Sequence, residues 1–388
     1  MLNAAFEGTI PGIQRRYPSL CEKRHVHIFH GLNASSLNHV NGYWRKLASG
    51  IIRNFAIKSI FPDAVFCPSV FEGDSESFAL LEPSSLGIPN IATQHDLIPI
   101  QMPDVYFYND PQFESFYKGR LKYLKDYTAL IAVSKATRDE TLSVVDYPAD
   151  RVSVDTEDAE PKFNNCDTVS LIDIESIRNR YGLSRSYLLY VGSGEPRKNL
   201  LGLVCAFSRL TQDLRETHDL VIIGSLTEQE ISELYRLCDD LSINADQLHL
   251  LGQVSDADLP LFYALASVFI MPSFHEGFGL PALEAIRCGT LTIGANRTSL
   301  PEVIGTPEAL FDPSDIDEIA ALISKALKDQ IFAARMKAAQ ALHCQNFSWS
   351  KAAQDTLKIL ERHAQKNPGS TEWSVLQARL DEFEAQTV

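Results

Sequence analysis

Short apolar runs alternate with helix-like spans along most of the chain, and they do so in two successive series. The first series contains β-rich runs at residues 25–29, 64–68, 88–93 and 129–133. The second contains β-rich runs at residues 187–191, 220–223, 248–251, 268–271, 291–293 and 309–311. Strands separated by helices form parallel sheets, and continuous apolar runs are typical of strands buried on both faces. The pattern predicts an α/β protein with two doubly wound parallel sheets and a cleft between them.

The alternation weakens and polarity rises between residues 151 and 186, where we place a domain boundary. We predict one α/β domain over residues 1–165 and a second over residues 166–350. Residues 351–388 are predicted to form a C-terminal helical segment whose last helix covers residues 373–385. A chain of 388 residues is long enough for two such domains.

Composition and charge exclude several classes of protein. The formal net charge of −15 disfavours a nucleic-acid binder that acts through a general basic field. The longest apolar stretch, residues 259–271, is shorter than the about 20 residues that a membrane span needs. The seven cysteines are scattered without a C-x-x-C pair, and residues 1–20 lack the apolar core of a secretory signal. We predict a cytoplasmic protein with reduced cysteines and no nucleic-acid partner.

A glycine-bearing turn follows the first strand of the second series. In open α/β sheets, ligands bind beyond the carboxyl ends of the strands, so the turn at residues 192–199 is a candidate site. It is not a dinucleotide fingerprint, because Arg197 stands where the third glycine would be and the next strand ends in Gly224-Ser225. Arg197 and Lys198 at the start of a helix suit a phosphate group instead. The alternative is that both are solvated surface cations.

The segment from His275 to Ala285 carries the most specific local signal. Pro281 suits a first helical turn, and the glycines before it leave the amides of residues 277–280 accessible. Glu276 and Glu284 flank these amides, about 12 Å apart if the span were fully helical. A ligand with hydroxyls at both ends and anionic oxygens between them fits, as in a nucleotide-diphosphate sugar. The alternative reads Glu276 as a helix-start carboxylate and Glu284 as a surface residue.

Three motifs carry a resemblance to a known family. They are E-G-F-G-L-P-x-L-E-A, E-P-R-K-N upstream of it, and H-D-L-I-P at residues 95–99. These motifs resemble those of the group 1 (family 4) retaining glycosyltransferases of the GT-B fold. The resemblance covers about residues 71–349. The resemblance implies two Rossmann-like domains across a cleft, the first on the acceptor side and the second binding a nucleotide sugar. It also implies metal-independent transfer of a hexose, with retention, to a glycan or lipid-linked acceptor in polysaccharide biosynthesis. GDP-mannose is the favoured donor substrate, and no further cofactor is expected.

The resemblance also implies roles for individual residues. Glu276 would contact the donor sugar near the reacting carbon, and His95 would face that sugar from the first domain. Arg197 and Lys198 would stabilise the departing diphosphate, while Glu284 would bind the ribose. The predicted donor-binding set consists of Gly192, Arg197, Lys198, Gly277, Phe278, Gly279, Leu280 and Glu284. Residues 252–266 are similar to the family's stretch that closes around the base.

The sequence departs from the family pattern at three places. Residues 1–8 lack the usual opening strand and glycine-rich loop, so the first βα unit is expected to be missing. Ser193 replaces an arginine that many members carry, and residues 155–158 replace an Asn-Gly-x-Asp motif. The competing hypothesis is a catalytically impaired GT-B binding or scaffold module that needs a partner domain, a second copy or an upstream segment. A GT-B epimerase or phosphorylase is a weaker alternative.

Three patterns mimic metal sites. Asp256-Ala257-Asp258 and Asp315-Ile316-Asp317 fit the D-x-D pattern, but each stands where a helix is predicted to begin, where acidic residues are favoured. The histidines at positions 25, 27 and 30 lie on one predicted strand without supporting carboxylates or cysteines. We therefore expect no metal. The resemblance further implies peripheral contact with the cytoplasmic membrane face.

Overall fold

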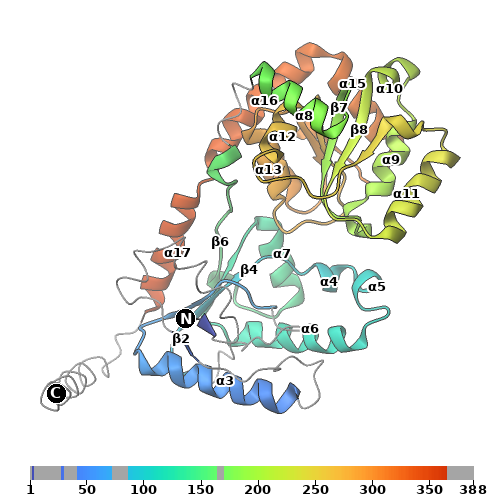
Figure 1. Ribbon diagram of the computed structural model, residues 1–388. Helices are drawn as coiled ribbons and strands as arrows, with labels where there is room; N and C mark the ends of the chain where they lie inside the picture. The colour runs from blue at the N-terminus through green and yellow to red at the C-terminus, as the bar shows by residue number, and fades with distance from the viewer. Residues whose placement is uncertain (1, 4–27, 30–41, 72–85, 164–169, 365–388) are drawn as a thin grey trace, which may run out of the picture.

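The computed structural model describes residues 2–3, 28–29, 42–71, 86–163 and 170–364. Two parallel sheets with flanking helices are stacked along the long direction of the molecule (Figure 1). The first domain lies at the bottom of this view and the second at the top. A long helix, α17 (Trp349–His363), runs down the left side from the second domain to the first.

The first domain is built on a four-stranded parallel sheet of order β3-β4-β5-β6. Its strands are β3 (Val65–Cys67), β4 (Asn90–Gln94), β5 (Ala129–Ala132) and β6 (Val152–Val154). Its helices are α3 (Gly42–Ser59), α4 (Ile98–Gln101), α5 (Pro103–Tyr106), α6 (Pro111–Tyr123) and α7 (Lys135–Val144). All four residues of β5 are buried, as expected for a central strand covered on both faces.

The second domain is built on a six-stranded parallel sheet of order β12-β11-β10-β7-β8-β9. Its strands are β7 (Ser186–Val191), β8 (His218–Ile223), β9 (Leu248–Leu250), β10 (Val268–Met271), β11 (Thr292–Ala295) and β12 (Leu310–Phe311). The strand order reverses at β7, between β8 on one side and β10 on the other. In sheets of this kind ligands bind at such a switch point.

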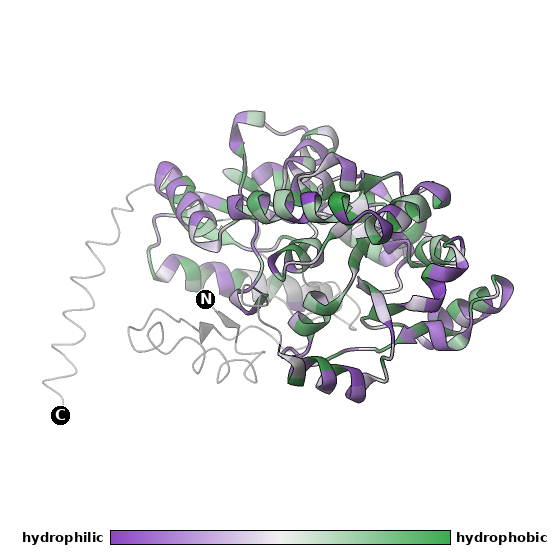
Figure 2. Cartoon of the chain, turned by 90° about the horizontal axis from the view of Figure 1, so that it is seen from above, coloured by the Kyte–Doolittle hydropathy of each residue, from purple (hydrophilic) through white to green (hydrophobic). Residues whose placement is uncertain are grey.

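Helices cover both faces of the second sheet. Their bounds are α8 (Leu171–Tyr181), α9 (Leu200–Ser208), α10 (Gln212–Thr217), α11 (Glu228–Asp240), α12 (Leu259–Leu265), α13 (Leu280–Arg287), α14 (Leu300–Ile304), α15 (Ile316–Lys328) and α16 (Gln330–His343). Helices α11, α9 and α15 pack together, and α8, α12, α13 and α16 form the other group. Figure 2 shows hydrophilic and hydrophobic segments mixed along the helices of the molecule, as expected where helices bury one stripe against a sheet.

The hydrophobic core follows the sheets but crosses the predicted boundary. Ala159 and Phe163, which follow β6 in the sequence, are buried in the core of the second domain. In the opposite direction, Ile359 of α17 is buried against the first sheet. Thr356 of the same helix donates a hydrogen bond to Asp155, at 3.0 Å. The chain thus passes between the two domains twice.

Two expectations about the first domain are wrong. Strand β6 lies at Val152–Val154, where we expected the pattern to have weakened, and it pairs in parallel with β5. No strand was expected at the start of the chain, whereas β1 (Leu2–Asn3) pairs in parallel with β2 (Ile28–Phe29). The histidines at 25, 27 and 30 and the helix predicted at 373–385 lie outside the described residues.

Candidate functional site

The segments singled out by the sequence meet at the switch point of the second sheet. The turn at residues 192–199 follows β7, and the loop at residues 272–279 follows the neighbouring strand β10. Parallel strands end at the same edge of a sheet, so the two segments lie side by side. The N–H of Phe274 donates to the carbonyl oxygen of Arg197, at 2.8 Å, which joins them directly.

Glu276 is held between the two cations of the turn. Its carboxylate lies 3.0 Å from Nη1 of Arg197 and 2.7 Å from Nζ of Lys198. All three side chains are largely buried. The same Arg197 nitrogen also donates to the carbonyl oxygen of His275, at 3.1 Å. The predicted anion-binding pair and the predicted sugar-binding carboxylate therefore form a single charged cluster.

Glu195 completes this cluster on its outer side. Its carboxylate accepts from Nε of Arg197 at 2.9 Å and from the hydroxyl of Tyr106, in α5 of the first domain, at 2.8 Å. Burial opposes ionisation of Glu195, but the hydrogen bond from Tyr106 and the charge of Arg197 outweigh it and lower its pKa. Burial and the contact with Glu195 raise the pKa of Tyr106, which stays a neutral donor.

Glu284 lies inside α13, which begins later than a fully helical segment would require. Gly279 is the N-cap of α13 and has a φ of 106°, a left-handed conformation that favours glycine. Pro281 follows in the first turn, as the sequence predicted. The buried hydroxyl of Tyr263 donates to the Glu284 carboxylate at 2.9 Å. Burial raises the pKa of Glu284 despite this hydrogen bond.

The turn after β7 also depends on glycine. The N–H of Gly192 donates to the carbonyl oxygen of Ile223, at 2.9 Å. A Cβ placed on Gly224, which has a φ of 142°, would lie 2.0 Å from the carbonyl oxygen of Gly192. The ends of β7 and β8 therefore approach more closely than side chains would permit, and Gly192 lies at that contact.

His95 follows β4 and faces residues of its own domain. Nε2 lies 2.8 Å from the carbonyl oxygen of Pro68, and Nδ1 lies 3.5 Å from the Glu157 carboxylate. The hydrogen bond with Glu157 raises the pKa of His95, although burial opposes the shift. Both ring nitrogens have an acceptor beside them, and such acceptors stabilise the charged form of the ring relative to the neutral form. The backbone carbonyl of His95, in contrast, lies close to Gly277, in the loop of Glu276.

Sequence reasoning missed the partners of the predicted residues. Glu157 belongs to the acidic run after β6, which departs from the family's Asn-Gly-x-Asp motif and carries no local sign of a contact with His95. Tyr263 stands in the stretch assigned to the base, and no local signal pairs it with Glu284. Tyr106 is contributed by the other domain, through a short helix with no periodic pattern.

The two D-x-D patterns are used within the fold. Asp258 is the N-cap of α12 and is bound by Arg180 at 2.6 Å and by the hydroxyl of Tyr181 at 2.8 Å. Asp315 is the N-cap of α15 and accepts two backbone N–H groups. Within the described ranges, no group of three or more His, Cys, Asp or Glu side chains is placed to hold a metal ion.

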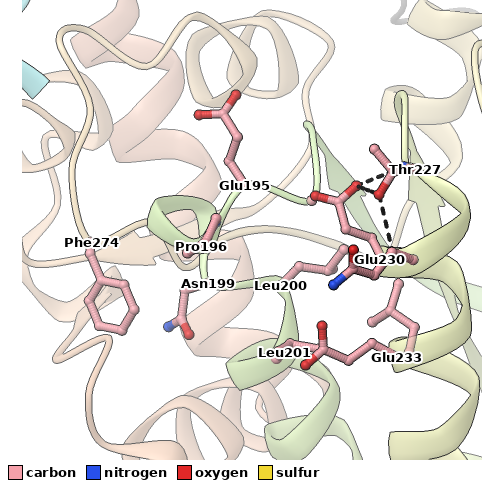
Figure 3. Close-up of a pocket in the computed structure, with 12 residues that line it drawn as sticks. Glu195, Pro196, Asn199, Leu200, Leu201, Thr227, Glu230, Glu233 and Phe274 are labelled. Carbon is pink, nitrogen blue, oxygen red and sulfur yellow. Dashed lines mark hydrogen bonds between the residues drawn. The ribbon is translucent and has the colours of Figure 1, made fainter. Parts of the chain in front are cut away.

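A pocket of about 560 Å³ lies beside the turn at residues 192–199, against α9 and α11 (Figure 3). Its lining residues are Gly194, Glu195, Pro196, Asn199, Leu200, Leu201, Thr227, Gln229, Glu230, Glu233, Leu234 and Phe274. Three of these are glutamates and none is cationic, so the pocket repels an anion. The cations of the turn, Arg197 and Lys198, are paired with Glu276 and do not line this pocket.

Comparison with solved structures defines the class of fold. Over 89% of each chain, the structure superposes on that of Anabaena Alr3699/HepE in complex with UDP and glucose, with a TM-score of 0.66 and 17% identity. It covers 86% of WaaG, a glycosyltransferase involved in lipopolysaccharide biosynthesis, with a TM-score of 0.63 and 14% identity. The fold is therefore GT-B, with two Rossmann-like domains.

The family follows from sequence. Residues 173–342 match the model of glycosyl transferases group 1. The O-antigen chain mannosyltransferase B of Escherichia coli is 33% identical over 267 residues, which are 66% of this chain and 67% of that protein. The chain belongs to the group 1 glycosyltransferases.

One set of relatives is longer than this chain. The serotype-specific mannosyltransferase WbdA of Escherichia coli is 32% identical over 377 residues, 96% of this chain but 46% of WbdA. The chain thus spans about half the length of these curated relatives. Of the helices in the described residues, none combines the length and apolar character needed to cross a membrane.

Proposed function

We propose that this chain transfers mannose from GDP-mannose to a glycan or lipid-linked acceptor, with retention and without a metal ion. The observation that carries the proposal is the cluster of Arg197, Lys198 and Glu276 at the switch point. Glu284 lies nearby in the sequence, in α13, which follows the loop of Glu276. The names of the Escherichia coli relatives support mannose as the sugar. The complex of HepE with UDP and glucose supports a nucleotide sugar as the donor.

In this proposal the charged cluster reorganises when the donor binds. Arg197 and Lys198 both pair with Glu276, at 3.0 and 2.7 Å, and Arg197 also pairs with Glu195, so two carboxylates balance the two cations. A diphosphate attracts the same two cations and competes with the carboxylate for them. Glu276 is then released toward the sugar, while Glu284 accepts from the ribose and keeps its hydrogen bond to Tyr263.

The reaction breaks the bond between the anomeric carbon and the diphosphate and forms a bond to an acceptor hydroxyl on the same face. Negative charge develops on the departing diphosphate, and preorganised cations and amides stabilise it. Arg197, Lys198 and the amides of residues 277–280 supply these groups. The departing phosphate takes the acceptor's proton, and Glu276 stabilises positive charge on the sugar. His95, whose pKa is raised by Glu157, belongs to the first domain on the acceptor side.

Calorimetry in EDTA with GDP, UDP, ADP and dTDP tests the donor site. GDP is expected to bind most tightly, and added Mg²⁺ or Mn²⁺ is expected to change its affinity little. Failure of all four to bind, or binding only with metal, contradicts the proposal. Incubation with GDP-mannose then separates a transferase from a binding module, because a module binds GDP without hydrolysing or transferring the sugar.

We further propose that α3 contacts an anionic membrane surface. Its sequence contains four basic residues and no acidic one, in a chain of net charge −15. Trp44, Ile51 and Phe55 are exposed by 67%, 63% and 75%, whereas Ser49 and Arg53 of the same helix are buried. An exposed apolar stripe with basic residues is the pattern of a helix that lies on anionic lipid.

Vesicle sedimentation tests this contact. The chain is expected to bind phosphatidylglycerol vesicles better than phosphatidylcholine vesicles, and salt is expected to weaken the binding. A variant with Ile51→Ser and Phe55→Ser should lose most of it. Tyr108→Ser, which removes another exposed aromatic, is the control and should bind normally. Equal binding to both vesicle types, or an unaffected double variant, contradicts the proposal.

A further inference from the structure

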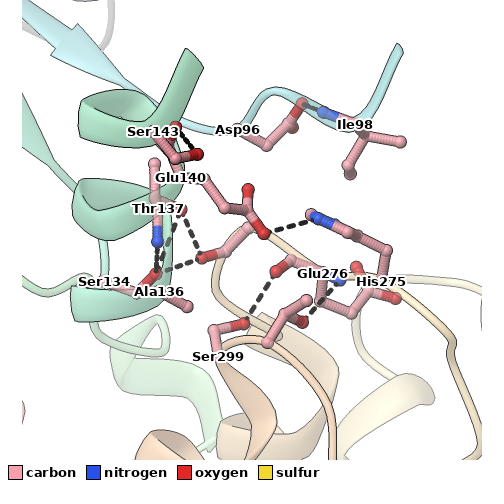
Figure 4. Close-up of polar contacts among 12 residues, drawn as sticks. Asp96, Ile98, Ser134, Ala136, Thr137, Glu140, Ser143, His275, Glu276 and Ser299 are labelled. Carbon is pink, nitrogen blue, oxygen red and sulfur yellow. Dashed lines mark hydrogen bonds and ion pairs between the residues drawn. The ribbon is translucent and has the colours of Figure 1, made fainter. Parts of the chain in front are cut away.

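Helix α7 of the first domain contacts the loop that carries Glu276 (Figure 4). Ser134 Oγ donates to the carbonyl oxygen of Gly277 at 2.7 Å, and Thr137 Oγ1 lies 3.1 Å from the same oxygen. Both side chains are almost fully buried. The residue after Glu276 is therefore bound from the opposite domain.

The residue before Glu276 is bound from the same helix. The Glu140 carboxylate, one turn further along α7, lies 2.7 Å from Nε2 of His275. Both side chains are largely buried, so little water competes for the contact. Glu276 is thus flanked on both sides by residues that α7 holds.

Gly277 permits the close approach of the two domains at this point. A Cβ on Gly277 would lie 2.3 Å from the carbonyl oxygen of His95 and 3.0 Å from Cβ of Asp96. Any larger residue would push the loop away from the first domain. The contact is therefore made between backbones, with the hydroxyls of α7 beside it.

A second segment of the far domain caps α7. The two carboxylate oxygens of Glu302, in α14, accept from the backbone N–H groups of Lys135 and Ala136, at 3.0 and 2.8 Å. Ser134 Oγ accepts the N–H of Thr137 within the helix itself. The first N–H groups of a helix have no partners inside it, and a carboxylate there is favoured by the helix dipole. The start of α7 is thus completed only when the domains are together.

The loop of Glu276 is also supported from its own domain. Thr298 Oγ1 accepts the N–H of Glu276 at 3.0 Å, and Ser299 Oγ lies 3.0 and 2.8 Å from the carbonyl oxygens of Glu276 and Phe278. Glu302 lies one helical turn beyond Ser299. The cap on α7 and the inner support of the loop therefore come from one short segment.

We propose that Glu302 is a positioning residue, which caps α7 and so fixes the closed arrangement in which α7 holds the loop on both sides of Glu276. When the domains separate, the cap, the Gly277 contact and the His275 contact are lost together. Glu276 then keeps only the support of its own domain. The catalytic consequence rests on the proposed function, whereas the effect of Glu302 on closure does not.

Small-angle X-ray scattering of Glu302→Ala, with and without GDP, tests the effect on closure. The variant is expected to have a larger radius of gyration than the unaltered chain in both conditions. Glu308→Ala is the matched control, because Glu308 is an exposed glutamate whose ion pair with Arg335 lies within the second domain. Glu302→Gln keeps an acceptor for one N–H group but lacks the charge, so an intermediate value is expected.

Activity and binding then test the positioning. In Glu302→Ala, turnover should fall roughly tenfold or more, as for loss of hydrogen bonds to a charged group. GDP affinity and the thermal midpoint of the second domain should stay close to those of Glu308→Ala. Because Glu302→Gln preserves shape, it also replaces the alanine variant in every measurement if that variant does not fold.

Two results overturn the proposal. One is scattering of both Glu302 variants that matches the control. The other is GDP affinity that falls in parallel with turnover, since Glu302 would then act within the second domain alone. If the unaltered chain transfers no sugar, the proposed function fails, while the scattering comparison still decides whether Glu302 governs closure.

Discussion

The two domains contribute to the candidate site in different ways. The second domain supplies the charged side chains, because Arg197, Lys198 and Glu276 come from neighbouring strand ends of one sheet. The first domain supplies chiefly hydroxyls, backbone and a helix start, which contact the loop of Glu276 without neutralising its charge. Its contacts with charged groups of the second domain lie around that loop: Glu140 contacts His275, the start of α7 donates to Glu302, and Tyr106 donates to Glu195.

This difference separates binding from turnover. The groups proposed to bind the nucleotide belong to one sheet, whose geometry does not depend on the other domain. The placement of Glu276 depends on both. Two domains of one chain can move apart and together, and the contacts between them are then broken and re-formed. Changes in the first domain should therefore affect the affinity for GDP less than they affect turnover. The following variants test that division.

Glu276→Gln is expected to have the largest effect. It removes the carboxylate proposed to stabilise charge on the sugar, and loss of such a group lowers turnover by roughly a hundredfold or more. GDP affinity should be unchanged or slightly higher, because Arg197 and Lys198 no longer share their charge with a carboxylate. Steady-state kinetics and calorimetry provide the two values. Glu233→Gln, in the neighbouring pocket, is the control and should alter neither.

Glu284→Ala should show the opposite result, with GDP affinity reduced and turnover largely kept. Loss of a hydrogen bond from the ribose to a charged group costs about 1.5–3 kcal/mol, or roughly ten- to a hundredfold in affinity. Turnover at saturating donor should change much less. Calorimetry with GDP and with guanine base distinguishes the causes, because only the nucleotide contains the ribose. A large fall in turnover with unchanged affinity would mean that the ligand lies in the reverse direction.

The pH dependence of GDP affinity should reveal the buried state of Glu284. Its raised pKa means that it gains a proton at higher pH than an ordinary glutamate, for which the pKa is about 4.3. The protonated group accepts less well, so affinity should fall as the pH is lowered, and the fall should begin at a higher pH than an ordinary glutamate would give. Glu284→Gln stays neutral throughout and should lose that part of the dependence. Parallel curves for the two proteins would assign the effect to the nucleotide's own phosphate.

Local patterns predicted regular elements in both domains. The helix at Gly42–Ser59 and the strand at Val268–Met271 agree with the structure because their periodicity lies within the segment. Strand β6 was missed, since three residues with a serine in the middle carry almost no pattern. The same limit applies to β1, which has only two residues.

For the site, sequence spacing located the chemistry but not its partners. Arg197 and Glu276 follow strands that the fold places side by side, so their proximity could be expected. Their direct ion pair could not, because it depends on rotamers set by the surrounding packing. The Glu302 contact is further from prediction, since it joins residues separated by more than 160 positions and leaves no periodic trace. The roles of these residues in catalysis stay predictions.

Tyr106→Phe should have the smallest effect and gives the finest test of the division. The change removes the hydrogen bond of 2.8 Å from the first domain to Glu195 and leaves the ring in place. Glu195 still accepts from Arg197, so the charged cluster should persist. A hydrogen bond to a charged group contributes about 1.5–3 kcal/mol, and Glu195 is only partly buried, so we expect the low end of this range and a fall in kcat/KM of about tenfold.

The division requires that this loss appear in turnover while GDP affinity stays within about twofold. Tyr108→Phe, an exposed tyrosine two residues away, is the control and should behave as the unaltered chain. Equal losses in affinity and turnover would show that the first domain reaches the nucleotide through Glu195. The two domains would then act as one unit in the site. The contact between Tyr106 of α5 and Glu195 would influence how Arg197 binds the nucleotide as well as how the domains close.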